Sequence, residues 1–164
     1  MNKEILYPTD CNEAYQLLIA QIKAMVESEH NALANLANST ALLKEFYQDR
    51  INWVGYYHLI NDELVLGPFQ GKVACTRLIK GKGVCQKAVS EKTIVIIDDV
   101  HKFADHIACD SASNSEIVIP IIINDQVTWV LDIDSPHFSC FKQEDAKYLK
   151  NFTDIIKKVL IDND

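Results

Sequence analysis

The residues of this sequence best able to do redox chemistry are its cysteines, Cys11, Cys75, Cys85, Cys109 and Cys140. No two of them form a C-x-x-C pair, which argues against a zinc ribbon and against a thioredoxin-type motif. A cysteine in a cytosolic chain is most often a small buried hydrophobic residue. We apply that interpretation to Cys11, on a helix without polar neighbours, and to Cys140.

The three remaining cysteines have surroundings that suggest reactivity. Cys109 lies on a polar loop beside His106 and Asp110. Polar groups and backbone N–H donors in such a loop stabilise a thiolate, which makes Cys109 a candidate nucleophile. Cys85 stands near the start of a short helix, where the partial positive charge of the helix end lowers the pKa of a thiol. Cys75 is expected to end a strand that faces the same region.

A second group of reactive residues consists of Glu116, Asp132 and Asp134. Side chains alternate along a strand, so Asp132 and Asp134 share one face of the expected sheet. A hairpin turn at residues 124–125 brings Glu116 to about the height of Asp134. Three clustered carboxylates repel one another unless a cation or a proton is present. The cluster is therefore either a solvated sheet edge or a site for an ammonium group, a metal ion or a protonated general acid.

The other candidate motifs are weak. His101 and His106 lie in a loop with no third ligand at a fixed spacing, so a zinc site that includes Cys109 and a carboxylate has little support. The Gly-Lys-Gly stretch at residues 81–83 is too short to be a phosphate loop. Aromatic residues of one expected strand either line a pocket or pack in the core; they are Trp53, Tyr56 and Tyr57.

The elements that must position these residues follow from hydrophobic periodicity and turn signals. Helices are expected over residues 10–28, 30–47, 84–91 and 141–160, the second weakened by its polar residues 38–40. Strands are expected over 51–59, 63–66, 72–79, 93–97, 116–123 and 126–134, with a Gly/Pro break at 67–71. Because hairpins join most of the strands, we expect an α+β fold. A central antiparallel sheet then carries N- and C-terminal helices on one face and a ligand pocket on the other.

Composition excludes several classes of function. The chain has 164 residues, with 16 Lys and Arg against 23 Asp and Glu, and a formal net charge of −7. That charge disfavours binding to a nucleic-acid backbone and to a membrane surface through a basic face. No apolar stretch is long enough to cross a bilayer, and the N-terminal residues do not resemble a signal peptide. We therefore expect a cytoplasmic protein.

Several sequence strings occur in the order found in a known family. They are NWVGYY, LGPFQGKVACTRL, KGKGVC, DVHKF, HIACDSASNSEIVIPI and VLDIDSP. Over about residues 50–140 the chain resembles the free methionine-(R)-sulfoxide reductases, which are single GAF-type domains. The resemblance implies one such domain over residues 1–164, with helices at about 10–47 and 141–160 flanking a sheet and pocket core at 50–140.

The resemblance also implies a chemistry, the reduction of the R epimer of free methionine sulfoxide. By position, Cys109 matches the nucleophile, Cys75 the resolving cysteine, and Cys85 a further cysteine of the disulfide relay. The carboxylates of the substrate pocket and the aromatic residues around the sulfoxide methyl group match Glu116, Asp132, Asp134, Trp53 and Tyr57. The proton for the departing oxygen is assigned to either Glu116 or Asp134. The family implies thioredoxin as reductant, a homodimer, and neither a cofactor nor a metal.

The sequence departs from the family pattern at three places. Thr128 and Trp129 precede VLDID where a small residue is usual, Gln86 replaces a common Gly, and the Pro-Gly that often precedes HIACD is missing. By strand alternation Trp129 faces away from Asp132, unless a bulge intervenes. Two alternatives to the enzyme remain open, a non-catalytic GAF ligand-binding module and a thiol redox sensor.

Overall fold

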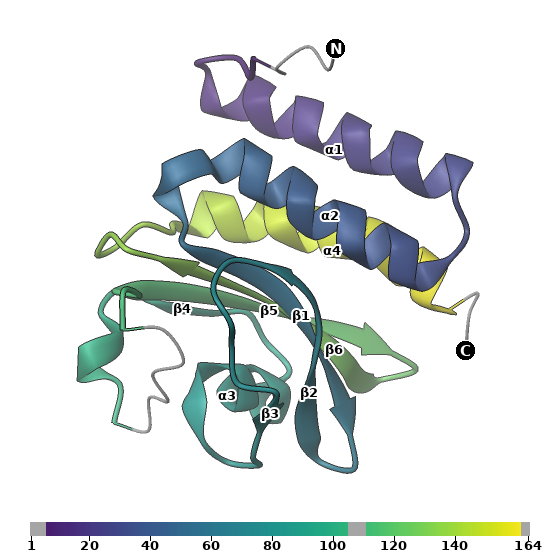
Figure 1. Ribbon diagram of the computed structural model, residues 1–164. Coiled ribbons are helices and arrows are strands. Elements are labelled where there is room, and N and C mark those ends of the chain that lie inside the picture. Colours follow the sequence, from purple (N-terminus) through teal and green to yellow (C-terminus); the bar gives the residue numbers. More distant parts are fainter. Residues whose placement is uncertain (1–5, 105–110, 162–164) are drawn as a thin grey trace.

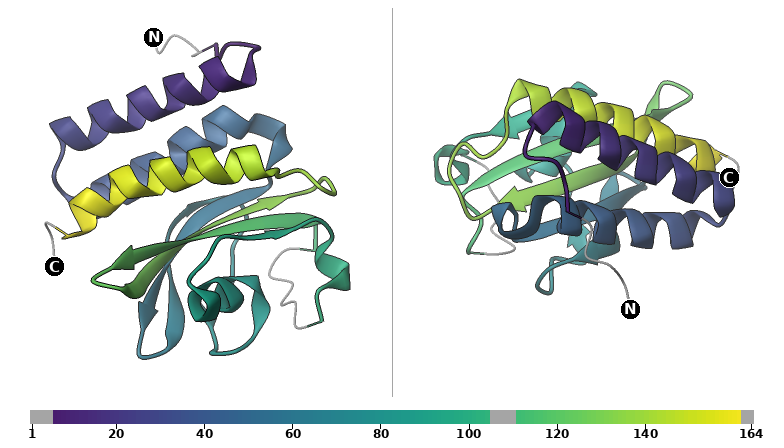
Figure 2. Two further views of the ribbon diagram at one scale, coloured as in Figure 1. Left: turned by 180° about the vertical axis from the view of Figure 1, so that it is seen from behind. Right: turned by 90° about the horizontal axis from the view of Figure 1, so that it is seen from above.

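An antiparallel sheet separates three helices on one side of the molecule from a single helix on the other. In the part of the chain described by the computed structural model, residues 6–104 and 111–161, the sheet has six strands in the order β3-β2-β1-β6-β5-β4. Helices α2 and α4 lie on one face, α1 packs on the outer side of these two helices, and α3 lies on the opposite face (Figures 1 and 2). This arrangement confirms the α+β fold that the sequence predicts.

The helices and strands agree with most of the expected elements. The helices are α1 (Cys11–Ser28), α2 (Ala32–Tyr47), α3 (Gly83–Glu91) and α4 (Gln143–Ile161), with short 3-10 turns η1 (Gln48–Arg50) and η2 (Val100–Lys102). The strands are β1 (Trp53–Ile60), β2 (Glu63–Gln70), β3 (Arg77–Leu78), β4 (Val95–Ile97), β5 (Ser115–Ile123) and β6 (Gln126–Ser135). None of the described helices is both long and apolar enough to cross a membrane.

A separate hydrophobic cluster covers each face of the sheet. The cluster under the helices includes Leu18, Ile22, Leu43, Val54, Tyr56, Ile119, Leu131 and Phe152. The cluster on the other face includes Trp53, Tyr57, Val84, Cys85, Ala88, Val118 and Val130. Strand alternation therefore divides one aromatic run: Tyr56 packs under the helices and hydrogen-bonds Ser39, whereas Trp53 and Tyr57 face α3. Residue types alone did not separate these three residues, and only the family resemblance assigned Trp53 and Tyr57 to the pocket.

The β5–β6 hairpin has the geometry that its turn residues predict. Asn124 and Asp125 have φ angles of 49° and 62°, which match the tight hairpin turn that follows the natural strand twist. One register shift occurs where Ile121 and Ile122 pair with β6, so Thr128 is the extra residue of a bulge. The bulge precedes Trp129 in β6, and alternation from Trp129 onward is intact.

Trp129 consequently lies under the helices, as alternation predicts. Its ring stacks on His58 at 4.2 Å between ring centroids and packs against the helix-side cluster. Asp132 and Asp134 line the pocket on the other face. The large side chain at position 129 therefore changes core packing and does not touch the pocket.

Two expected strand boundaries were wrong. Strand β2 runs through Gly67 and Pro68, because a bulge opposite Gly55 and Tyr57 accommodates a residue that has no N–H to donate. The strand expected at 72–79 is reduced to the two residues of β3. Helix α2 is unbroken, since the hydroxyls of Ser39 and Thr40 donate to carbonyls of the preceding turn.

A buried carboxylate joins α1 to the start of α4. Asp145 accepts a hydrogen bond from the Lys142 backbone N–H at 2.7 Å, as the third residue of a helix does in a capping box. It also accepts from the Tyr15 hydroxyl, which is hydrogen-bonded to Tyr47, and lies 3.9 Å from the Arg50 guanidinium. A local cap and a tertiary contact thus depend on one side chain.

Replacement of this carboxylate should loosen the helical layer. We expect Asp145→Ala to lower the free energy of unfolding by about 2–4 kcal/mol, because it leaves a buried hydroxyl and a helix N–H without an acceptor. Urea denaturation measures the change. Asp154→Ala on the same helix is the control, since Asp154 is exposed and pairs only with Lys150 in the described part of the chain; its cost should stay below about 1 kcal/mol. Equal losses in both variants would contradict the assigned role.

Candidate active site

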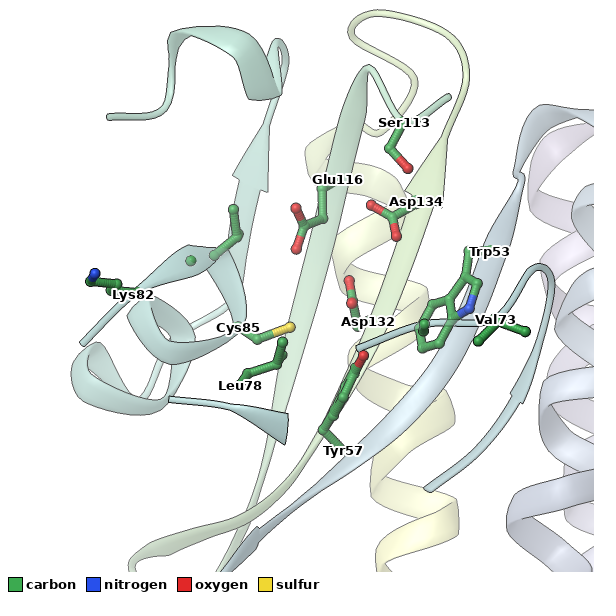
Figure 3. A pocket seen from close by; sticks show the side chains of 13 residues that line it. Trp53, Tyr57, Val73, Leu78, Lys82, Cys85, Ser113, Glu116, Asp132 and Asp134 are labelled. Atoms are coloured by element: carbon green, nitrogen blue, oxygen red, sulfur yellow. The ribbon is translucent and has the colours of Figure 1, made fainter. Parts of the chain in front are cut away.

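A pocket opens on the sheet face opposite to α2 and α4, between α3 and the strands (Figure 3). Counted with its open mouth it has a volume of about 580 Å³. Its lining residues are Trp53, Tyr57, Val73, Ala74, Leu78, Lys82, Gly83, Val84, Cys85, Ser113, Glu116, Asp132 and Asp134. Sequence reasoning missed Val73, Ala74 and Leu78 as lining residues, because residues 72–79 were expected to form a regular strand.

Three carboxylates form the floor of the pocket. Glu116 on β5 pairs directly with Asp134 on β6, at the height that the hairpin count predicts, and Asp132 stands two residues along on the same face. Glu116 is 6% exposed and Asp132 is 7% exposed. The cluster is therefore not a solvated sheet edge.

Burial makes these groups hard to ionise. Desolvation, with the charges of Asp132 and Asp134 added, raises the pKa of Glu116 well above its usual value. Desolvation also raises the pKa of Asp132 to about 6, although hydrogen bonds to Cys85 and Glu116 lower it in part. The site thus holds a proton near neutral pH, which a general acid requires.

Cys85 lies in the first turn of α3, with its thiol pointing at the carboxylates (Figure 3). It is 3% exposed. Burial, followed by the charges of Asp132, Glu116 and Asp134, raises the pKa of its thiol well above the usual value. The lowered pKa expected from the helix end was wrong, because desolvation and nearby negative charge outweigh the partial charge of a short helix.

A buried amide holds α3 in place. The side chain of Gln86 donates to the backbone oxygens of Leu78, at 3.0 Å, and Asp62, at 3.2 Å. These bonds tie the helix to β3 and to the β1–β2 turn. The Gln that replaces a common Gly of the family therefore anchors the helix that carries Cys85.

An aromatic wall faces the carboxylates. Trp53 stacks on Phe69 and on Tyr57, with centroid separations of 5.4 and 5.9 Å, and its indole N–H donates to the Lys72 carbonyl. The Tyr57 hydroxyl donates to the Cys75 carbonyl at 3.0 Å. The wall therefore connects the sheet to the irregular segment that carries Cys75.

Two glycines leave room for the indole of Trp53. A Cβ built on Gly55 would lie 2.4 Å from Cη2 of Trp53, and one on Gly71 would lie 2.5 Å from its Cδ1. Gly71 also has a φ of 138°, which residues with a side chain rarely adopt. The position of the indole thus depends on the absence of side chains at both places.

The described cysteines differ in state. Cys75 is disulfide-bonded, whereas Cys11, Cys85 and Cys140 are free thiols. The expectation that Cys75 ends a strand was wrong. Cys75 lies in the irregular segment before β3. Cys109 lies outside the described residues, as do its neighbours His106 and Asp110.

The residues on either side of that gap are placed. Ser113 lines the pocket, is buried, and accepts a hydrogen bond from the Asn52 side-chain amide at 3.0 Å. His101 is hydrogen-bonded to Asn114 at 2.9 Å. The chain therefore enters β5 with Ser113 and Glu116 both at the pocket.

Fold and pocket together define a GAF domain, and a model of the GAF domain family matches residues 36–160. The free methionine-R-sulfoxide reductase of Escherichia coli is 49% identical, over 93% of this chain and 92% of that protein. The enzyme of Neisseria meningitidis, solved with its substrate, is 41% identical with a TM-score of 0.91, over 97% of this chain and 95% of that chain. The Staphylococcus aureus fRMsr, solved in complex with substrate, is 46% identical with a TM-score of 0.84, over 95% of this chain and 99% of that chain. The chain belongs to the free methionine-R-sulfoxide reductase family and is an oxidoreductase.

Crowding at the indole gives a first test of the pocket geometry. We expect Gly55→Ala to push Trp53 out of its stacked position and to cost about 1–3 kcal/mol of stability. Fluorescence of Trp53, read in a Trp129→Phe background, measures the displacement. Gly81→Ala is the control, because a Cβ on Gly81 meets none of the described atoms within 4 Å. The φ of 80° at Gly81 strains an alanine there without crowding Trp53, so the spectrum should stay unchanged. An unchanged spectrum for Gly55→Ala would refute the close contact.

The buried acids should make stability depend on pH. Below about pH 4 Asp132 is protonated in both the folded and unfolded chain, and as pH rises through about 6 the folded state must bury its charge. The free energy of unfolding should therefore fall between pH 4 and pH 7, by on the order of 2 kcal/mol from this group. Asp132→Asn should remove that part of the slope, measured by urea denaturation at both pH values. Glu63→Gln, at a partly exposed position outside the pocket, should keep it. A steep slope retained in Asp132→Asn would contradict the assignment.

Proposed function

We propose that this chain reduces free L-methionine-(R)-sulfoxide to L-methionine, with Cys109 as nucleophile, Cys75 as resolving cysteine and thioredoxin as reductant. Membership in the family supports the reaction. The observation that carries the substrate assignment is a buried oxygen: Oδ1 of Asp132 has no hydrogen-bond partner among the described residues and lies at the pocket floor. An acceptor buried in this way is stabilised when a ligand brings a donor.

The pocket supports recognition of a free amino acid. The ammonium group of the substrate supplies both the missing donor for Asp132 and a positive charge that relieves repulsion among the three carboxylates. The Trp53–Tyr57 wall supplies an apolar surface for the methyl group of the sulfoxide. A methionine sulfoxide within a peptide chain has no ammonium group, so this pocket selects the free form.

The first chemical step needs a thiolate and a proton. The Cys109 thiolate attacks the sulfoxide sulfur, and the oxygen, protonated by Glu116, is transferred to the cysteine as a sulfenic acid while methionine leaves. Counting atoms, a thiol and a sulfoxide become a sulfenic acid and a thioether. We assign the proton to Glu116 rather than Asp134, because burial and two neighbouring carboxylates keep its pKa well above the usual value.

The second step regenerates the thiol. The Cys75 thiol displaces water from the sulfenic acid to give a disulfide, which thioredoxin reduces with its own dithiol. Cys75 is already disulfide-bonded and the other described cysteines are free, which supports Cys109 as its partner. Cys85 is 3% exposed, which favours direct reduction by thioredoxin over obligatory exchange with Cys85. The family resemblance supports a cytoplasmic homodimer.

One coupled assay tests the reaction. NADPH consumption with thioredoxin, thioredoxin reductase and free methionine-(R)-sulfoxide should show turnover, and the S epimer and N-acetylmethionine sulfoxide should not, since the latter lacks the ammonium. Cys109→Ser should abolish activity, and Cys75→Ser should yield about one methionine per chain. Glu116→Gln should lower kcat by about 10²- to 10⁴-fold, the usual value of a general acid. Cys11→Ser, at an exposed position on α1, is the matched control.

The same assay, together with a binding measurement and a peroxide treatment, separates the alternatives. Binding of the sulfoxide without turnover would identify a ligand-binding module. Formation of a disulfide by peroxide, with no methionine produced, would identify a thiol redox sensor. Full activity in Cys109→Ser would overturn the proposed mechanism.

A further inference from the structure

A thiol and two carboxylates converge at the pocket floor from three separate elements. Cys85 comes from α3, Glu116 from β5 and Asp132 from β6, and Figure 3 shows all three side chains directed at one region. One sulfur and one oxygen from each carboxylate lie within 4.8 Å of one another, and all three residues are buried. The spacing of these three residues along the chain does not predict that they meet, because only the tertiary fold brings α3 over the hairpin.

These donors suit a particular class of cation. Thiolate sulfur favours Zn²⁺ and related soft ions, whereas Mg²⁺ and Ca²⁺ prefer sites made only of oxygen. Zinc binds sulfur at about 2.3 Å and carboxylate oxygen at about 2.0–2.2 Å, so its ligands lie roughly 3–4 Å apart. The three donors lie within 4.8 Å of one another, which is close to this spacing. A fourth position stays open toward the cavity.

The unpartnered oxygen of Asp132 supplies an independent argument. Among the described residues its Oδ1 meets no donor although the residue is more than nine-tenths buried and lines the cavity. An orphaned carboxylate oxygen beside a thiol and a second carboxylate leaves the floor short of positive charge. Burial and mutual charge raise the pKa of the Cys85 thiol and the Glu116 carboxyl, so a cation would bind by replacing their protons.

We propose that the pocket binds one thiophilic divalent cation, Zn²⁺ or Cd²⁺, through Cys85, Glu116 and Asp132, and that the cation blocks entry of the substrate. Binding changes no oxidation state: the metal forms bonds to sulfur and oxygen, and the thiol and any protonated carboxyl release their protons to solvent. The cation and the ammonium group of the substrate compete for the same carboxylates. Metal binding stands without the proposed function, and only the inhibition rests on it.

Direct titration tests the metal site. Oxidised protein free of reductant keeps Cys75 in its disulfide, and Cd²⁺ is added while the thiolate-to-cadmium absorbance is recorded. We expect one Cd²⁺ per chain with a thiolate band, and Zn²⁺ to compete for it while Mg²⁺ does not. Cys85→Ser should lose the band and weaken binding by about 10- to 100-fold or more. Cys140→Ser, which removes a free thiol away from the pocket, should match the wild type.

A second variant, Glu116→Gln, tests the site independently in case Cys85→Ser does not fold. Glu116→Gln should keep the thiolate band while it weakens Cd²⁺ binding by about tenfold or more. Absence of a band in the wild-type protein, or unchanged affinity in Cys85→Ser, would overturn the metal site. Loss of the band in Cys140→Ser would place the ion elsewhere and would overturn it equally.

Inhibition is measured without the recycling enzymes, which contain thiols of their own. Prereduced protein, freed of reductant, is mixed with methionine-(R)-sulfoxide, and methionine formed in one turnover is counted with and without Zn²⁺. We expect Zn²⁺ to suppress the turnover and excess substrate to restore it. Metal binding without any turnover would leave the site intact and refute the proposed function. Turnover that is unaffected by a bound cation would refute the competition.

Discussion

The pairing of β5 with β6 is the constraint on which the rest of the molecule depends. Its register places Glu116 opposite Asp134 and, by alternation, turns the apolar residues of both strands toward α2 and α4. A shift of one residue would move the carboxylates into the helix-side core and expose the apolar residues. The turn at residues 124–125 and the bulge at Thr128 set this register from one end of the hairpin.

The cost of this arrangement is a negatively charged floor in a poorly solvated place. Folding tolerates it because a proton remains on Glu116 near neutral pH, which removes part of the repulsion. The proton that stabilises the empty pocket is also one that sulfoxide reduction consumes and that a cation would displace. Structure, proposed catalysis and proposed inhibition therefore draw on one feature, the desolvation of two carboxyl groups.

Local patterns predicted the face of each strand residue well. They predicted the ends of strands and the pKa of the Cys85 thiol less well. Parity put Trp129 under the helices and Asp132 in the pocket, because alternation persists wherever no bulge intervenes. The same reasoning expected a break at Gly67-Pro68, where a bulge instead carries β2 onward. It also expected an acidic thiol at Cys85, because a helix end is visible in sequence whereas burial against remote carboxylates is not.

The sequence by itself determined the α+β class, the hairpin that carries the carboxylates and the family to which the chain belongs. These properties reside in periodicity, in turn residues and in strings of neighbouring residues. Only the tertiary structure decided which groups share an environment: that α3 presses Cys85 against Glu116 and Asp132, and that Gly55 leaves space for the Trp53 indole. The physical reason is that desolvation and charge interactions act through distance in space, and no local pattern records that distance.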